Sequence, residues 1–204
     1  MTDEPRLEPL PREAWDDDVR AALRAGFSEA VADRFLSTGA DAMRTPNAIG
    51  TMLRHPALAG RFLAYNGVLL FEPVLAPRLR ELIVLRVAAR TRSEYEWVQH
   101  VRLAPRCGVT PEEIDKIADG QTTDGWTPLE ADLLAATDQL MDSYRIDDAT
   151  WARLAQHLDE QQLVEVVFVT GTYTCLAMAF NSFGVQLDPD LDTTATRSLP
   201  DLQE

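Results

Sequence analysis

The spacing of capping and apolar residues along the chain predicts a series of helices. Two segments, Thr110-Pro-Glu-Glu113 and Thr127-Pro-Leu-Glu130, each place proline directly after a threonine and glutamate three residues after it. This pattern is typical of helix starts, because threonine and glutamate satisfy free backbone N–H groups and proline is tolerated at the first helical position. Gly108 predicts the end of the preceding helix, and Asp148 and Asp159 predict the N-caps of two later ones.

One segment departs from this helical pattern. Residues 163–175 are rich in β-branched residues, and by propensity alone they favour a strand. Because a lone strand has no partner for its backbone hydrogen bonds, we interpret the segment as a buried helix. The uncharged run 166–180 is shorter than the roughly 20 apolar residues that span a bilayer. We therefore predict an all-α fold, a single-domain antiparallel helical bundle.

The two ends of the chain have a different composition from its middle. Residues 1–12 hold three prolines and many charges, and the last residues are also polar. We expect mobile arms at 1–12 and 188–204, because such segments bury too little apolar surface to fold alone. The helical domain is expected to span 13–187, and a chain of 204 residues is long enough for one well-buried core.

Three ionisable side chains fall on helical faces that are otherwise apolar. Glu81 has Val84, Leu85 and Ala88 at i+3, i+4 and i+7. In the next predicted helix, Ser93, Glu96 and His100 follow one another at i, i+3 and i+7, together with Trp97. A short link between the two helices would pack them antiparallel and bring Glu81 toward His100. Since buried ionisable groups are costly unless they are paired, this is the candidate site for chemistry.

Each of these residues also has a structural interpretation. Ser93 and Glu96 form a Ser-x-x-Glu capping box, which we favour for Ser93. His100 could be a core histidine satisfied by Glu96 at i−4, although two nearby carboxylates favour a functional role. Trp97 is expected to be pocket wall or core. Tyr95 lies on the opposite, mostly polar arc, so it is a candidate contact for substrate only if that arc meets another helix or subunit.

Charge and cysteine content narrow the classes of function. The formal net charge of −14 opposes binding to nucleic acid or anionic lipid, so we expect neither as a partner. Cys107 and Cys175 are far apart and form no CxxC, and there is no HExxH, so we expect no disulfide framework and no metal. The first residues lack a basic and an apolar region, which favours a cytoplasmic location.

The basic residues gather around the candidate site. Seven arginines flank it, against three glutamates nearby: Arg78, Arg80, Arg86, Arg90, Arg92, Arg102 and Arg106. This local positive charge could attract a small anionic substrate. Equally, the arginines could cap helices or pair with acidic residues, including across an oligomer interface.

The middle of the chain resembles the carboxymuconolactone decarboxylase family of the alkylhydroperoxidase-D-like superfamily. The resemblance rests on Glu81, Ser93, Tyr95-Glu96-Trp97, His100, Gly108 and Thr110-Pro-Glu-Glu-Ile. Arg54-His-Pro-Ala-Leu and Gly171-Thr-Tyr extend this resemblance. In the peroxidase branch a CxxC pair stands where this chain has Ser93 and Glu96. Both redox sulfurs are therefore missing, and neither replacement can cycle through a disulfide.

The resemblance implies a carboxymuconolactone decarboxylase-like helical domain that assembles into a homo-oligomer and uses no metal or organic cofactor. It also implies a carboxy-lyase, with decarboxylation of a lactone-type substrate as the specific hypothesis. His100 would then be the acid and hydrogen-bond donor, Glu96 would set its tautomer, and Arg86 would hold a substrate carboxylate. Two alternatives stay open: a non-catalytic oligomeric or small-molecule-binding protein, and a thiol peroxidase, which the missing CxxC disfavours.

Overall fold

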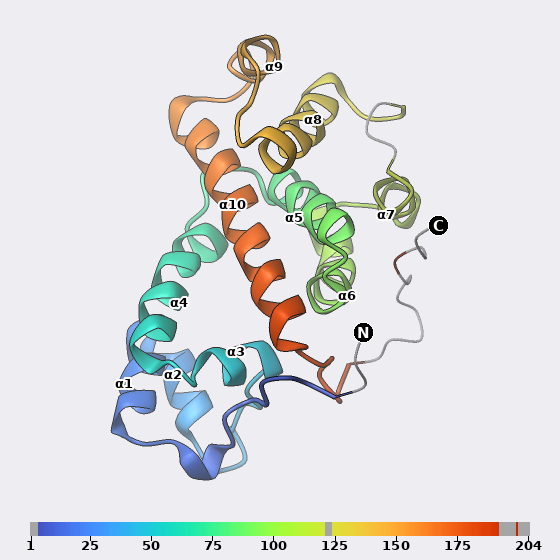
Figure 1. The fold of residues 1–204 in the computed structure, drawn as a ribbon. Coiled ribbons are helices and arrows are strands. Elements are labelled where there is room, and N and C mark those ends of the chain that lie inside the picture. Colours follow the sequence, from blue (N-terminus) through green and yellow to red (C-terminus); the bar gives the residue numbers. More distant parts are fainter. Residues whose placement is uncertain (1–3, 121–123, 192–198, 200–204) are drawn as a thin grey trace. The chain divides into compact units, whose positions relative to one another are not determined.

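The structure is a computed structural model that describes residues 4–120, 124–191 and 199. The described residues are helical or irregular and contain no strand, so the all-α prediction is confirmed. The described residues divide into two compact units, one formed by residues 4–72 and 181–191 and the other by residues 73–180. Figure 1 shows the helices of both units in sequence colours.

The first unit is built from four α-helices and a short 3-10 turn. These elements are η1 (Arg12–Ala14), α1 (Asp17–Gly26), α2 (Glu29–Leu36), α3 (Asn47–Met52) and α4 (Pro56–Phe71). Its core contains Trp15, Leu23, Phe35, Leu53 and Leu63. Helices α1 and α4 can approach closely because glycines face the contact: a Cβ placed on Gly26 would lie 2.6 Å from the Cβ of Leu63.

Parts of both predicted arms are hydrogen-bonded within the first unit. The N–H groups of Arg6 and Leu10 donate to the carbonyls of Phe183 and Gly50 at 2.8 and 2.9 Å. The Asp188 carboxylate accepts the N–H of Asn47 at 2.7 Å. Residues 1–3, 192–198 and 200–204, which also belong to these arms, lie outside the described residues. The domain limits at 13 and 187 stay a prediction.

The second unit carries the candidate site. Its elements are α5 (Pro77–Thr91), α6 (Glu94–Leu103), η2 (Ala104–Cys107), α7 (Pro111–Ala118), α8 (Pro128–Ser143), α9 (Asp148–Leu154) and most of α10 (Glu160–Phe183). Helix α5 is buried over most of its surface, since every residue from Glu81 to Leu85 is buried, as are Val87 and Ala88. Such a helix belongs to the centre of a core.

Most of the predicted helix limits of this unit are confirmed. Thr110 and Thr127 form complete capping boxes at the starts of α7 and α8. Gly108 ends η2 with a φ of 78°, the left-handed conformation that favours glycine. Asp159 accepts the N–H of Gln162 at 2.9 Å at the start of α10. The cap of α9 is Asp147 rather than Asp148, because it is the Asp147 carboxylate that accepts the Thr150 N–H.

The ambiguous segment 163–175 is helical, as interpreted, and lies within α10. Among the described residues, α10 is the single helix whose length and hydropathy would suffice to cross a membrane, and half of the apolar window is buried inside the protein. A core helix meets the same criterion. The buried Glu165 on α10 accepts the N–H groups of Val74 and Leu75, at 2.7 Å for the latter, and so holds the segment before α5.

Candidate active site

A two-residue link between α5 and α6 brings the candidate residues together. Helix α5 ends at Thr91, Arg92 adopts the left-handed conformation with a φ of 54°, and Ser93 precedes α6. The N–H of Ser93 donates to the carbonyl of Ala88 at 3.1 Å, which closes the turn. The chain therefore reverses sharply, and the two helices pack against each other as the sequence predicted.

This reversal pairs Glu81 of α5 with His100 of α6. The distance between Glu81 Oε1 and His100 Nδ1 is 2.8 Å, and the two residues are 1% and 8% exposed. The predicted approach of Glu81 to His100 is confirmed. Because Nδ1 is engaged with the carboxylate, Nε2 is the ring nitrogen that remains for a substrate.

Tyr173 of α10 completes a three-helix setting for the histidine. Its ring meets the His100 ring edge to face, with centroids 5.1 Å apart and planes at 85°. Tyr173 is buried, and its pKa is raised by that burial and by the charges of Glu96 and Glu81. Tyr173 therefore lies within electrostatic reach of both carboxylates. The sequence signalled it only as the tyrosine of Gly171-Thr-Tyr, which supported the resemblance without receiving a role.

Glu96 and Ser93 are buried without hydrogen-bond partners. Glu96 is 2% exposed, and neither of its carboxyl oxygens nor the Ser93 hydroxyl has a partner among the described residues. The capping-box interpretation of Ser93 is therefore wrong, because Ser93 occupies the N-cap position but makes no side-chain cap. The expectation that Glu96 sets the tautomer of His100 is also wrong, since it is the Glu81 carboxylate that binds Nδ1 of His100.

The environment of Glu96 favours its protonated form. Burial raises the pKa of this carboxyl well above its ordinary value, because the charged form would lose hydration with no hydrogen bond to replace it. A buried polar group without a partner is rare in proteins and calls for a functional explanation. Glu96 is thus a buried carboxyl with a raised pKa, one helical turn from His100.

Arg80 and Cys107 lie at the edge of this cluster. Burial and the charge of Glu81 raise the pKa of the Cys107 thiol, and the charge of Arg80 and a hydrogen bond from it act in the opposite direction. The charge of Arg80 also acts on Tyr173, whose pKa it lowers against the other influences. Arg80 therefore lies within electrostatic range of Cys107 and Tyr173, and sequence reasoning counted it only as one of seven arginines.

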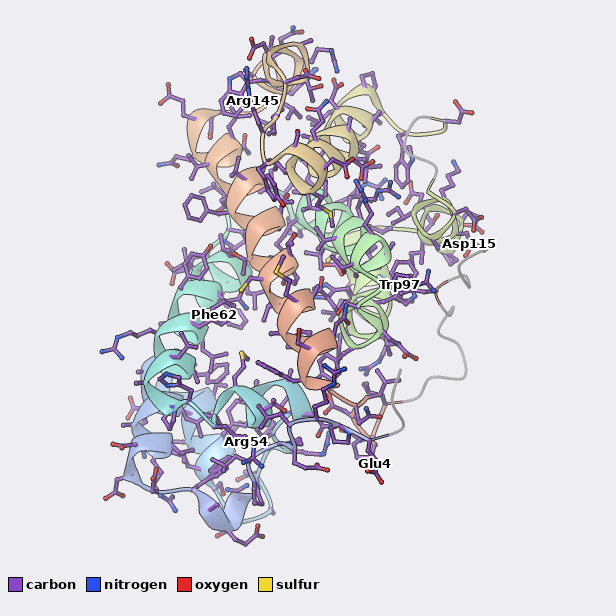
Figure 2. The ribbon with its side chains drawn as sticks, in the orientation of Figure 1. Glu4, Arg54, Phe62, Trp97, Asp115 and Arg145 are labelled. Carbon is purple, nitrogen blue, oxygen red and sulfur yellow. The ribbon has the colours of Figure 1, made fainter. Side chains whose placement is uncertain are left out.

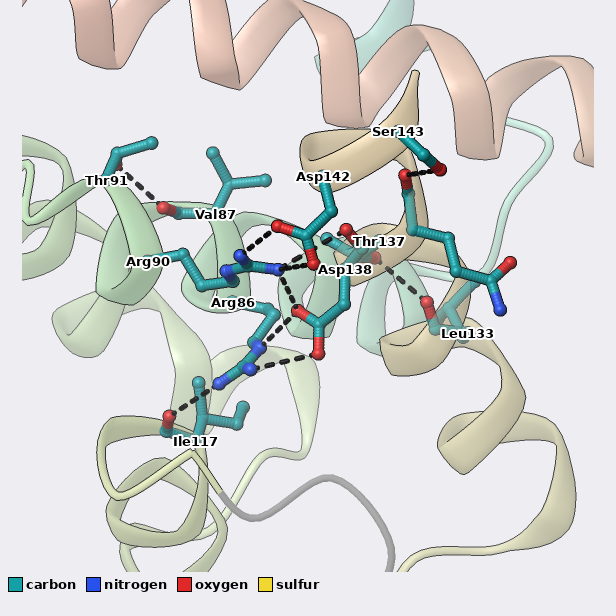
Figure 3. Close-up of polar contacts among 11 residues, drawn as sticks. Arg86, Val87, Arg90, Thr91, Ile117, Leu133, Thr137, Asp138, Asp142 and Ser143 are labelled. Atoms are coloured by element: carbon teal, nitrogen blue, oxygen red, sulfur yellow. Dashed lines mark hydrogen bonds and ion pairs between the residues drawn. The ribbon is translucent and has the colours of Figure 1, made fainter. Parts of the chain in front are cut away.

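Arg86, expected to hold a substrate carboxylate, is engaged elsewhere. Its Nε and Nη2 donate to the two carboxylate oxygens of Asp138 on α8 at 2.7 and 2.9 Å, and Nη1 donates to the carbonyl of Ile117 (Figure 3). Arg90 also binds Asp138. These bidentate, partly buried contacts give Arg86 a role in joining α5 to α8.

The two aromatic candidates of α6 are both packed inside the protein. Trp97, labelled in Figure 2, is completely buried and belongs to the core. Tyr95 is buried as well, and its ring packs edge to face against Phe180 at 5.2 Å. The arc of α6 expected to be mostly polar therefore meets α10.

No group of three or more potential metal ligands occurs among the described residues.

Several solved structures are similar to this chain in fold. An uncharacterized peroxidase-related protein from Ralstonia eutropha JMP134, an alkylhydroperoxidase AhpD core, matches with a TM-score of 0.69 at 19% identity, over 90% of this chain and 94% of its own. A peroxidase-related protein from Silicibacter sp. TM1040 gives 0.66 at 17% identity, over 92% and 91%. A variant of the debrominase Bmp8, in complex with 2,3,4-tribromopyrrole, gives 0.66 at 18% identity, over 93% and 95%. The fold is alkylhydroperoxidase-D-like.

A part of the sequence also matches a known family. Residues 56–139 match the carboxymuconolactone decarboxylase family. The segment contains Glu81, Glu96 and His100, so the resemblance in sequence is confirmed. No curated protein matches the chain. This match supports a general enzyme-like role.

Proposed function

We propose that this protein is an acid–base enzyme that acts on a small carbonyl or carboxylate compound, with decarboxylation of a lactone-type substrate as the specific reaction. The observation that carries this proposal is the buried Glu81–His100 hydrogen bond beside the buried, unpartnered Glu96. One carboxylate is committed to the histidine and the other is held neutral, so the same site offers a base and an acid.

The Glu81–His100 pair supplies the hydrogen-bond donor for the reaction. In a γ-carboxylated unsaturated lactone, the bond between the ring carbon and the carboxylate breaks and carbon dioxide leaves. The electron pair then spreads through the conjugated ring onto the lactone carbonyl oxygen. A protonated Nε2 of His100 donates to that oxygen, and the Glu81 carboxylate at Nδ1 stabilises the positive imidazole.

Glu96 supplies the proton that completes the reaction. The ring carbon that accumulates electron density must receive a proton, and a neutral carboxyl group in a dry environment is a suitable donor. Burial raises the pKa of Glu96 well above its ordinary value, which favours the protonated form that the reaction requires. Glu96 also needs no metal or organic group for this step.

Arg80 takes the role in substrate binding that the sequence suggested for Arg86. Its charge acts on both Tyr173 and Cys107, which places it beside the His100 cluster. An arginine is well suited to hold a substrate carboxylate through two parallel hydrogen bonds. Arg86 is instead held by the Asp138 carboxylate.

The test measures release of carbon dioxide from γ-carboxylated unsaturated lactones by the purified protein. We expect His100→Gln to lower kcat by about 10²- to 10⁴-fold, the usual contribution of a positioned acid or base. The control is His157→Gln, the same change at an exposed histidine outside the site, which we expect to retain full activity. Full turnover in His100→Gln would refute the mechanism, and saturable binding without turnover in the wild type would favour the non-catalytic alternative.

A second comparison separates the two arginines. Arg80→Gln is expected to raise KM about tenfold or more, because a charge-assisted contact with the substrate is lost. Arg86→Gln is expected to lower thermal stability and leave KM within a factor of about two, since its partner is Asp138. Equal KM values for Arg80→Gln and the wild type would contradict the proposed role of Arg80 in substrate binding.

Thiol chemistry is the less favoured alternative. A thiol peroxidase needs a thiolate, and burial raises the pKa of the Cys107 thiol, so its protonated form is stabilised. Peroxide consumption that Cys107→Ser abolishes would support this alternative. Peroxide consumption retained by a protein that lacks both Cys107 and Cys175 would rule this alternative out.

A further inference from the structure

The start of α6 holds three buried polar atoms that call for a partner. They are the hydroxyl oxygen of Ser93 and both carboxyl oxygens of Glu96, and none of them has a hydrogen-bond partner among the described residues. Both side chains are almost completely shielded from solvent. Because a buried polar group without a partner costs free energy, native proteins contain few of them. Three such atoms within one helical turn therefore indicate a place that a ligand completes.

Ser93 and Glu96 lie where one ligand group can reach both. Side chains three residues apart are neighbours on the same face of a helix. Ser93 occupies the N-cap position of α6 but makes no side-chain cap there. By contrast, the buried hydroxyl of Thr137 in the same unit donates to the carbonyl of Leu133 at 2.9 Å. The Ser93 hydroxyl is thus left for a group from outside the chain.

The three atoms themselves specify the kind of group that would satisfy them. Burial raises the pKa of Glu96, which favours the protonated carboxyl. In that form Glu96 has a donor on one oxygen and an acceptor on the other, and the Ser93 hydroxyl can donate and accept. A carbonyl group could only accept, so it would leave the acceptor oxygen of Glu96 unsatisfied. A hydroxyl group can accept from Ser93 and donate to Glu96, and so it satisfies both side chains.

A charged group fits this place less well than a hydroxyl group does. The burial that disfavours a carboxylate on Glu96 also disfavours a substrate carboxylate beside it. Arg90, in the last turn of α5, is engaged as a counter-charge elsewhere, because it binds Asp138 and Asp142 (Figure 3). We therefore expect the group to be uncharged.

The position of Ser93 separates this group from the reacting part of the substrate. Ser93 and His100 are seven residues apart on α6, which is about 10 Å along the helix axis at 1.5 Å per residue. Glu96 stands between them on the same face. When its acceptor oxygen is engaged by the hydroxyl group, its other oxygen keeps the proton for the ring carbon.

We propose that Ser93 and Glu96 form a subsite for an uncharged hydroxyl group of the substrate, carried on a side chain that extends along α6 away from His100. The hydroxyl group accepts a hydrogen bond from Ser93 and donates one to the acceptor oxygen of Glu96. This assignment deepens the proposed function and rests on it for the role of Glu96 as proton donor. The preferred substrate is a hydroxylated unsaturated lactone.

The first test measures binding without turnover. The probes are three unsaturated lactones that lack the γ-carboxylate, so they cannot lose carbon dioxide. They differ only in a short side chain that ends in a hydroxyl, methoxy or methyl group. Isothermal titration calorimetry should give the hydroxyl probe a Kd about tenfold or more below the others, because methoxy cannot donate and methyl can neither donate nor accept.

The second test compares two variants that each remove a buried hydroxyl. Ser93→Ala should reduce the preference for the hydroxyl probe to about twofold or less, and it should not lower the midpoint of urea unfolding, since this hydroxyl has no partner in the chain. The matched control is Thr137→Val, whose hydroxyl bonds within α8. This variant should retain the full preference.

Release of carbon dioxide from the corresponding γ-carboxylated lactones separates this inference from the proposed function. A hydroxyl preference that depends on Ser93 would support the subsite even if no lactone lost carbon dioxide, and only the decarboxylation would then be refuted. Turnover that is equally fast with all three side chains would refute the subsite and leave the proposed function standing.

Four binding results would overturn the subsite. The first is equal Kd values of the hydroxyl and methyl probes for the wild type, which would mean that water serves these atoms. The second is a methoxy probe that binds as tightly as the hydroxyl probe. The third is a preference that Ser93→Ala leaves unchanged, or loses only together with a lowered unfolding midpoint. The last is no binding of the hydroxyl probe at millimolar concentration.

Discussion

Ser93 and Glu96 show how one sequence motif adopts two structures. The motif Ser/Thr-x-x-Glu occurs before α6, α7 and α8, and its glutamate caps the helix in the latter two. At Ser93 the same spacing leaves the hydroxyl and the carboxyl buried and unpartnered. The two capping boxes that form have proline directly after the threonine, whereas Glu94 follows Ser93. Burial, and not spacing, therefore distinguishes the two capping pairs from the unpartnered pair of Ser93 and Glu96.

At this scale we predict that Glu96→Gln changes how stability depends on pH. The folded protein raises the pKa of Glu96 above the ordinary 4.5, so the wild type loses stability as pH rises from about that value through the folded pKa. The loss approaches about 1.4 kcal/mol per pH unit, the value for one proton. Glutamine carries no such proton, so urea unfolding at a series of pH values should show a flatter dependence in the variant.

Glu112→Gln is the control for this measurement, because Glu112 is exposed on α7. Its stability should follow the wild-type pH dependence. If Glu96→Gln also followed it, Glu96 would be ionised in the folded protein and could not be the proton donor.

Helix α10 shows how packing overrides local preference at the scale of an element. Leu163, Val166, Val169 and Tyr173 are buried along one side of it, a spacing that only a helix provides. The hydroxyl of Thr170 donates to the carbonyl of Val166 at 2.9 Å, and Thr174 donates to Thr170 in the same way. β-Branched residues are thus accommodated because their apolar groups pack and their hydroxyls bond within the helix.

At the scale of elements we predict that Arg78→Gln loosens the contact of α5 with α7 and α8. Arg78 binds Glu113 and Glu130, each at 2.7 Å, and all three side chains are largely buried. Removing it should cost about 2 kcal/mol at pH 7, because two carboxylates lose their partner. Hydrogen bonding to Arg78 lowers the pKa of Glu113, so this stabilisation is present above pH 4.5 and is lost as pH falls through the lowered pKa.

Chemical denaturation at pH 7 and at pH 3 measures this effect. The difference between Arg78→Gln and wild type should shrink at the lower pH. Arg145→Gln, which removes an exposed ion pair with Asp148, should cost less than about 0.5 kcal/mol. Equal costs for the two variants would contradict the assigned role of Arg78.

At the scale of the whole molecule, the chain forms two compact units, each with its own core, and α10 passes from one to the other. The Glu81–His100 pair, Glu96 and Tyr173 all belong to residues 73–180. The catalytic proposal therefore depends on a single unit. Residues 4–72, with their core around Trp15 and Leu23, contribute none of the groups that the mechanism uses.

We predict that Gly26→Ala destabilises the first unit without changing catalysis below its unfolding temperature. The new Cβ would lie 2.6 Å from the Cβ of Leu63, which should cost about 1 to 3 kcal/mol through overpacking. Gly67→Ala in α4 of the same unit meets its nearest neighbour only at 3.8 Å and should gain up to about 1 kcal/mol. Differential scanning calorimetry measures the change in stability, and kcat at 25 °C measures the effect on catalysis. A large fall in kcat for Gly26→Ala would contradict the prediction that the first unit does not contribute to catalysis.

Patterns that act locally could be predicted from the sequence. Thr110 and Thr127 specify helix starts through their own hydrogen bonds, and Gly108 allows the left-handed residue that ends a helix. The inward stripe of Glu96 and His100, and the turn that returns α6 onto α5, also follow from helical periodicity and a short link. Arg86 could not be assigned in the same way, because Asp138 is 52 residues away along the chain.

The sequence by itself determined the helical class, the family resemblance and the set of Glu81, Glu96 and His100, because periodicity and residue chemistry are local properties. Tertiary structure decided the surroundings of each member of that set. It joined Glu81 to His100, buried Glu96 and raised its pKa, packed Tyr173 against His100, and committed Arg86 to Asp138. These outcomes depend on which side chains distant in the chain share a buried space, since burial and pairing set both charge state and hydrogen bonding.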